Sequence, residues 1–194
     1  MPSPSARKLR TDAARNRDHV LDTATALFTE RGEAVQMADV AREAGVGVGT
    51  VYRHFPTRRA LVEAAAERRF ADILDHARAA CRTEPDARRA LAAFLTRVAE
   101  VHEQGRALSG AIESVLGDTE PRGPVGAELT EFGAELLERG RVEGLIRDDA
   151  TVADLYMVVG AVATVSRTGI GDWRRFVELS LDGLSPRERS RLTD

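Results

Sequence analysis

Cysteine and long apolar runs are both scarce in this chain of 194 residues, and each shortage excludes a class of protein. Because Cys81 is the only cysteine, the chain by itself can form neither an internal disulfide nor a cysteine-based zinc site. The longest mostly apolar stretch without a charge covers residues 155–166, whereas a helix needs roughly 20 apolar residues to cross a bilayer. The basic N-terminus also lacks the apolar block that follows it in a secretory signal. We therefore expect a cytoplasmic protein that has no membrane partner.

The composition that remains favours helices. Alanine is the commonest residue, and the alternation that marks a half-buried strand is scarce. The formal net charge of -3 argues against a generic nucleic-acid coat, but this charge is unevenly distributed. Residues 1–59 carry a net charge of +3 and residues 60–194 carry -6. Any surface for nucleic acid is therefore expected in the first third of the chain.

The spacing of apolar residues predicts an all-α fold of about nine helices and no strand. The polar, basic residues 1–15 predict a flexible arm instead. Gly32 and Gly140 are expected to end helices, and Thr57 to cap a long one. The expected helices cover residues 20–31, 37–44, 48–55, 57–82, 85–102, 108–116, 125–139, 152–167 and 172–184, with a loop at 117–126.

Two of these helices, at residues 37–44 and 48–55, are short and are joined by a glycine turn, which is a helix-turn-helix pattern. In such a motif, N-terminal residues of the second helix meet base edges in the major groove of double-stranded DNA. Gly45 allows the left-handed backbone of the turn, while Ala41 and Ala44 allow close packing. The exposed face of the second helix is predicted to consist of Gly47, Val48, Gly49, Thr50, Tyr52, Arg53 and His54.

Residues 13–73 resemble the DNA-binding domain of the TetR family of bacterial transcriptional regulators. The resemblance rests on the runs LDTATALFTERG and DVAREAGVGVGTVYRHF and on the segment from Pro56 to Leu61. It implies that Val48 and Arg53 set the sequence preference, whereas Arg58 and several residues of the second helix contact or position phosphates. The predicted DNA-binding set is Gln36, Met37, Gly47, Val48, Gly49, Thr50, Tyr52, Arg53, His54 and Arg58.

Three positions differ from the usual pattern of that family. Gln36 follows Val35 where a Thr/Ser pair is usual, and Gly47 stands where serine is common, so two capping hydroxyls are missing. Arg58 replaces the usual lysine and keeps its charge. DNA binding is therefore still expected.

The resemblance also implies an order of domains and a function. Residues 16–82 would form the DNA-binding domain and its linking helix, with the motif at 36–55. Residues 83–185 would bind an effector and dimerise, and 186–194 would form a tail. The predicted function is a ligand-responsive regulator, a repressor that binds a near-palindromic operator as a homodimer and is released by a small-molecule effector.

Two further sets of residues are predicted for this second domain. A mostly apolar effector pocket would be lined by Phe70, His76, Phe94, His102, Phe132, Tyr156, Met157 and Trp173. The broad apolar surface of the last two helices would form a four-helix dimer interface made of Leu155, Val158, Val159, Val162, Val165, Phe176, Val177, Leu181 and Leu184.

Other chemistry finds little support in the sequence. The glycines at 45–49 lack the spacing and the lysine of nucleotide-binding loops, and the four histidines lack metal-ligand spacing. Adjacent Asp148 and Asp149 would point apart on a connector, where capping of a helix N-terminus explains them better than catalysis. We therefore expect no enzyme, no cofactor and no metal. The alternative is a helical small-molecule-binding or scaffold protein whose motif no longer contacts DNA; an enzyme that uses the helical cavity is more distant.

Overall fold

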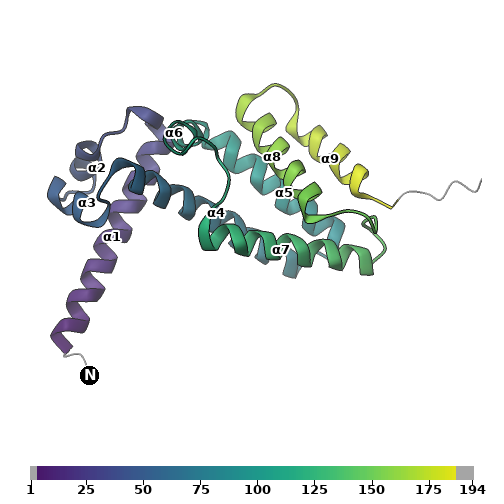
Figure 1. Ribbon diagram of the computed structural model, residues 1–194, viewed down its shortest axis with the longest axis horizontal. Coiled ribbons are helices and arrows are strands. Elements are labelled where there is room, and N and C mark those ends of the chain that lie inside the picture. The colour runs from purple at the N-terminus through teal and green to yellow at the C-terminus, as the bar shows by residue number, and fades with distance from the viewer. Residues whose placement is uncertain (1–3, 187–194) are drawn as a thin grey trace, which may run out of the picture. The chain divides into compact units, whose positions relative to one another are not determined.

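The computed structural model describes residues 4–186, and within them the chain forms nine α-helices, one 3-10 turn and no strand (Figure 1). The all-α prediction is therefore confirmed for the described chain. The elements are α1 (Pro4–Arg31), η1 (Gly32–Ala34), α2 (Met37–Glu43), α3 (Val48–His54), α4 (Arg58–Thr83), α5 (Ala87–Gln104), α6 (Arg106–Leu116), α7 (Gly123–Val142), α8 (Val152–Thr168) and α9 (Trp173–Leu184).

The helices are divided between two compact units, and the division does not follow chain order. Unit 1 takes the chain up to Arg69 together with Gly105–Glu120, and unit 2 takes Phe70–Gln104 and the chain from Pro121. Thus α4 contributes its first half to unit 1 and its second half to unit 2. The sequence predicted a single boundary after residue 82, and it did not reveal that α6 belongs with the first unit.

Unit 1 is built on α1, which packs against α2, α3, α6 and η1. Val20, Leu27 and Phe28 of α1 are buried in its core. At the end of α1, Gly32 has a φ of +57°, and a Cβ there would lie 3.0 Å from the carbonyl oxygen of Ala107 in α6. Glycine is therefore required both by the turn and by the close approach of α6.

The start of α1 differs from the prediction. Residues 4–15, expected as part of a flexible arm, are helical, because α1 begins at Pro4. The physical reason lies in the segment's own residues: proline suits the first turn of a helix, and the alanine, leucine, arginine and lysine that follow are strong helix formers. Residues 1–3, the rest of that predicted arm, and residues 187–194 of the predicted tail lie outside the described residues.

Unit 2 is centred on α5, which packs against α7, α8 and α9. The N-termini of α8 and α9 are capped by side chains: Thr151 Oγ1 accepts from Asp154 N, and Asp172 Oδ1 accepts from Arg174 N. The prediction that α7 ends at Gly140 is wrong, since the helix continues to Val142 and the chain turns at Gly144, where φ is +69°. Gly140 instead allows Ile146 to pack directly against the helix backbone.

Candidate DNA-binding surface

A small apolar core fixes α2 against α3. Val40, Ala41, Val51 and Phe55 are all at most 4% exposed. The turn between the helices has Gly45 at a φ of +66°, and the Val46 N–H donates to the Ala41 carbonyl over 3.0 Å. This geometry is the helix-turn-helix that the glycine spacing predicted, and it holds one face of α3 outward.

The N-terminus of α2 is stabilised by a residue that sequence analysis missed. The Asp39 carboxylate accepts a hydrogen bond from the Gln36 backbone N–H over 3.0 Å and another from the Arg42 guanidinium over 2.7 Å. These two bonds, the backbone one first, hold the pKa of Asp39 below its ordinary value. An acidic residue three positions after the N-cap is a capping-box signal, so Asp39 was recognisable from the sequence.

Met37 does not belong to the surface. Its side chain is 6% exposed and lies in the core of unit 1, so its prediction as a DNA contact is corrected. An apolar residue in the first turn of a short helix packs inward because α1 lies against α2. Gln36, its neighbour, is exposed at the N-cap of α2.

The outward face of α3 carries most of the predicted set. Val48 is 46% exposed and Tyr52 is 47% exposed, which is high for large apolar side chains. Gly47, Gly49 and Arg53 are also exposed, while Thr50 and His54 are half-buried. Gly47 offers α3 no side-chain cap, as the sequence indicated.

Arg58 lies at the start of α4 and faces the protein. Its Nε donates to the Val35 carbonyl over 3.2 Å, its Nη2 donates to the Glu33 carbonyl over 2.9 Å, and its guanidinium lies 5.8 Å from the centre of the Phe28 ring. These contacts join α4 to η1 and α1. Arg58 therefore holds the start of α4 against η1 and α1, and its predicted phosphate contact stays a prediction.

Two cationic or polar residues of α1 also support the motif and were not predicted. The Arg17 guanidinium lies 5.0 Å from the centre of the Phe55 ring, and a ring nitrogen of His19 lies 3.2 Å from the Ala44 carbonyl oxygen. Contacts across more than 20 residues leave no local pattern in a sequence, which is why both were missed.

The predicted effector-pocket residues are only partly brought together. Phe94 and Phe132 meet edge to face with ring centres 5.8 Å apart, and Phe70, His102 and Trp173 are buried. His76 is exposed and Met157 is 68% exposed, so neither lines an interior. Burial raises the pKa of Tyr156, and its hydrogen bond with Thr130 opposes that rise.

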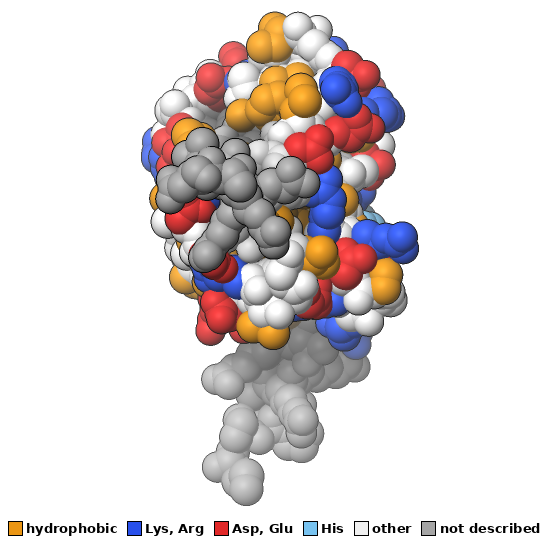
Figure 2. Space-filling view, turned by 90° about the vertical axis from the view of Figure 1, so that its right-hand side faces the viewer, with side chains coloured by type: hydrophobic (Ala, Val, Ile, Leu, Met, Phe, Trp, Pro, Cys, Tyr) orange, Lys and Arg blue, Asp and Glu red, His pale blue; other side chains and the backbone are white. Residues whose placement is uncertain are grey.

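The predicted dimer interface also divides in two. Leu155, Val162, Val177, Leu181 and Leu184 are at most 6% exposed, so they form the core of unit 2 and are corrected as surface residues. They face inward because α8 and α9 both pack on α5. Val158, Val159, Val165 and Phe176 are half-buried, and the exposed apolar residues nearby are Met157, Ile170 and Leu179. Figure 2 shows one face of the chain, on which hydrophobic side chains lie among charged ones.

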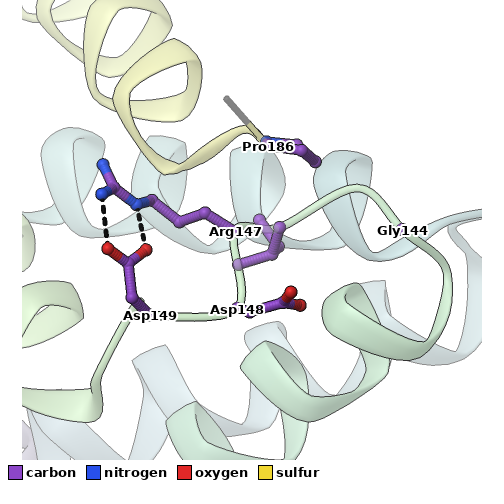
Figure 3. Close-up of a pocket in the computed structure, with 6 residues that line it drawn as sticks. Gly144, Arg147, Asp148, Asp149 and Pro186 are labelled. Carbon is purple, nitrogen blue, oxygen red and sulfur yellow. Dashed lines mark hydrogen bonds and ion pairs between the residues drawn. The ribbon is translucent and has the colours of Figure 1, made fainter. Parts of the chain in front are cut away.

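Two of the surface pockets of the described chain lie in unit 2. One, of about 330 Å³, lies between α8 and α9 and is lined by Val165, Ile170, Gly171, Asp172, Arg175, Phe176 and Leu179. The other, of about 380 Å³, lies at the connector from α7 to α8 and reaches Pro186 (Figure 3). There Arg147 pairs with Asp149, whereas the Asp148 carboxylate points elsewhere, and neither aspartate caps α8 as predicted. Neither pocket is lined by a residue of the predicted effector set.

The described residues 4–186 hold neither a group of side chains that could bind a metal ion nor a helix that could span a membrane. There, no three histidine, cysteine or acidic side chains are grouped so that they could hold a metal ion. Every helix in that part of the chain is too short or too polar to cross a membrane.

Comparison with known proteins agrees with this geometry. Residues 20–65 match the family model of bacterial regulatory proteins of the tetR family, and residues 86–186 match that of the SbtR-like transcriptional regulator C-terminal domain. The HTH-type transcriptional regulator SAR0097 of Staphylococcus aureus is 41% identical over 66 residues, which are 32% of this chain and 34% of that protein. The chain thus spans about a third of the length of the curated relatives it matches.

Solved structures cover far more of the chain. A TetR transcription regulatory protein from Mycobacterium vanbaalenii is 38% identical, with a TM-score of 0.65, and the match covers 91% of this chain and 99% of that one. The TetR transcriptional regulator SCO0520 from Streptomyces coelicolor is 29% identical, also with a TM-score of 0.65, over 89% of this chain and 99% of that one.

Proposed function

The chain belongs to the TetR family and is a transcriptional regulator with a DNA-binding helix-turn-helix, and we propose that it is an effector-released repressor. It binds a near-palindromic operator as a homodimer and works in the cytoplasm, where the operator lies. The observation that carries the proposal is the outward face of α3, with Val48, Tyr52 and Arg53 exposed on a motif whose other face is locked into a core.

The exposed residues divide by chemistry into two kinds of DNA contact. Val48, at the start of α3, and Arg53 reach base edges, while the hydroxyls of Thr50 and Tyr52 and the ring of His54 reach phosphates. Gln36, at the start of α2, adds a polar contact to the DNA backbone. Gly47 and Gly49 allow the helix to approach closely.

The homodimer is proposed to form through the outer faces of α8 and α9. The exposed Met157, Ile170 and Leu179 and the apolar pocket between the two helices support this assignment. Half-buried Val158, Val159, Val165 and Phe176 would be covered by the partner. Two α3 helices in successive major grooves need a separation of about 34–36 Å or a matching multiple, which requires a near-palindromic operator.

The effector is proposed to bind in unit 2 among the buried aromatic residues. Trp173 supports this, because its indole Nε1 is buried and has no hydrogen-bond partner among the described residues. A ligand atom that accepts this N–H would remove the cost of an unsatisfied buried donor. The ligand would act as an inducer by binding more tightly to the state that cannot span the operator.

Selection from a randomised duplex library at near-physiological salt tests the DNA-binding part. The expected result is an enriched inverted repeat that the purified dimer binds. Failure to enrich any sequence would overturn the proposal and favour the helical small-molecule-binding or scaffold protein.

Trp173 makes the effector part testable with the same protein. It is the only tryptophan, and the Arg174 guanidinium lies 4.1 Å from its ring centre, so its fluorescence should change when a ligand binds nearby. Compounds that change the emission should release the operator; compounds that bind with equal affinity to free and DNA-bound protein would contradict induction.

A further inference from the structure

Val48 is an exposed apolar side chain between two glycines on the outward face of α3. It is 46% exposed, and Gly47 and Gly49 on either side contribute no side chain. Tyr52, one helical turn later on the same face, is 47% exposed. The isopropyl group of Val48 therefore stands alone at the start of the helix.

The fold itself does not require either neighbouring glycine. Gly45 must be glycine because its φ is +66°, but Gly47 has an ordinary φ of -68°. A Cβ added at Gly47 or Gly49 would meet nothing within 4 Å. Glycine also destabilises a helix relative to alanine, so Gly49 weakens α3 without any gain in internal packing. The bare backbone leaves space for a molecule that lies against α3.

The chemistry of Val48 restricts what it can recognise on DNA. Its side chain has neither a donor nor an acceptor, so it cannot pair with the polar atoms that guanine, adenine and cytosine present in the major groove. The C5-methyl group of thymine is the one apolar feature on those base edges.

We propose that Val48 reads a thymine in each operator half-site through its C5-methyl group, and that Gly47 and Gly49 let the α3 backbone approach that base. This inference rests on the proposed operator binding. It adds a chemical prediction: the methyl group itself, rather than a hydrogen bond to thymine, sets the preference at that position.

Deoxyuridine provides the direct test because it lacks only the methyl group. The probe is the duplex that the wild-type protein enriches from the randomised library, with each thymine replaced in turn by deoxyuridine. At one symmetric thymine pair, affinity should fall about fourfold per half-site, the value of one buried methyl group. Replacement of the other thymines should have smaller effects.

Two valine variants connect the methyl effect to this side chain. Val48→Ala should bind the thymine duplex several-fold more weakly and should no longer distinguish deoxyuridine from thymine at that pair. Val142→Ala, which truncates a valine that is 80% exposed on α7, should keep the wild-type discrimination.

Gly49→Ala tests the close approach separately. The added methyl group has free space in the protein, so the thermal midpoint should be unchanged or rise, yet operator affinity should fall by about tenfold. A weaker complex with an unchanged thermal midpoint would support a close approach of this backbone to DNA.

The outcomes separate the two proposals. Sequence-selective binding with no loss at any deoxyuridine, or a loss that persists unchanged in Val48→Ala, would overturn the thymine reading and leave operator binding intact. Absence of sequence-selective binding by the wild type would overturn the proposed function, and the reading of thymine with it.

Discussion

Arg139 of α7 and Glu143, the C-cap residue of that helix, form an ion pair with 2.7 Å between Nε and Oε1, and each also holds the end of another helix. Arg139 donates to the carbonyls of Cys81 and Glu84 at the end of α4, and Glu143 accepts from the Ala87 N–H at the start of α5. The pair thus satisfies unpaired backbone groups at both sides of the α4–α5 connection.

Arg139→Ala should therefore lower the thermal midpoint by about 2–4 °C, the shift expected for losing one capping interaction in a chain of this size. The matched control is Arg175→Ala, whose side chain makes an exposed pair with Glu178 on α9. Thermal unfolding followed by circular dichroism compares them. Equal midpoints for the two variants would contradict the role of Arg139 in holding the helix ends.

Low pH should weaken the interactions of Glu143 at the α4–α5 connection and so lower the stability of the protein. The Ala87 N–H, and then the Arg139 guanidinium, lower the pKa of Glu143 below its ordinary value of 4.5. A carboxylate with a lowered native pKa stabilises the fold fully above its unfolded pKa and stops doing so as pH falls through the native value. Glu143→Gln should reduce stability at pH 7 and flatten its decline below about pH 4.5. Glu131→Gln, an exposed change on α7, should follow the wild-type curve at each pH.

Alanine substitutions of Arg58 and Arg53 should have different effects, the first on stability and the second on DNA binding. Arg58→Ala removes two hydrogen bonds and a cation–ring contact, so it should destabilise unit 1 by about 1–2 kcal/mol. Arg53→Ala should leave the thermal midpoint unchanged, weaken operator binding by about 1–3 kcal/mol and relax the sequence preference at one position of each half-site. Unfolding curves, and titrations with operator variants at several salt concentrations, distinguish the two changes. If Arg58→Ala changed the salt slope but not the stability, the assigned contacts would be wrong.

Because Arg69 is buried, loss of its hydrogen-bond acceptor on α6 should lower the stability of the protein strongly. Burial lowers the pKa of its guanidinium to about 10, and Nη1 donates to Ser109 Oγ over 2.8 Å. Ser109→Ala should destabilise the protein by about 1–3 kcal/mol because it removes an acceptor from a buried charged group. Ser114→Ala, an exposed change on the same helix, should stay within about 0.5 kcal/mol of the wild type in urea unfolding.

Gly140 should tolerate no side chain. An alanine Cβ there would overlap Ile146 Cγ1 and lie 3.0 Å from Ile146 Cβ. Gly140→Ala should therefore cost about 1–3 kcal/mol through overpacking, and a second change, Ile146→Ala, should add less than its usual cost of about 2–5 kcal/mol because alanine lacks the overlapping Cγ1. Gly110→Ala, with nothing within 4 Å of its added Cβ, should not destabilise the fold. Urea unfolding of all four proteins provides the comparison.

Local patterns explain what the sequence could predict. Helical periodicity located the nine helices of residues 4–186, and Gly32, Gly45, Thr57 and Asp172 act at the turns and helix starts assigned to them. The outward face of α3 was also predictable, because its neighbours in the motif are apolar at fixed spacing. Such signals depend on residues only a few positions apart.

The misses share a different cause. Met37 and the inner residues of α8 and α9 were assigned to surfaces although tertiary packing buries them, and His76 was assigned to an interior although it is exposed. Which side of an apolar helix faces α1 or α5 depends on contacts distant in sequence. The structural role of Arg58 was missed for the same reason, since Val35 and Phe28 lie far from it along the chain.

The discontinuous make-up of unit 1 has a consequence for engineering chimeric regulators. Because Gly105–Glu120 belongs to the same compact unit as the α2–α3 motif, a fragment cut after residue 82 loses α6 and uncovers the surfaces of α1 and η1 that α6 packs against. A graft that transfers operator specificity should therefore either carry both segments or exchange only the outward residues of α3. In this protein the part that can be exchanged is therefore the exposed surface of α3, and not one continuous segment of the sequence.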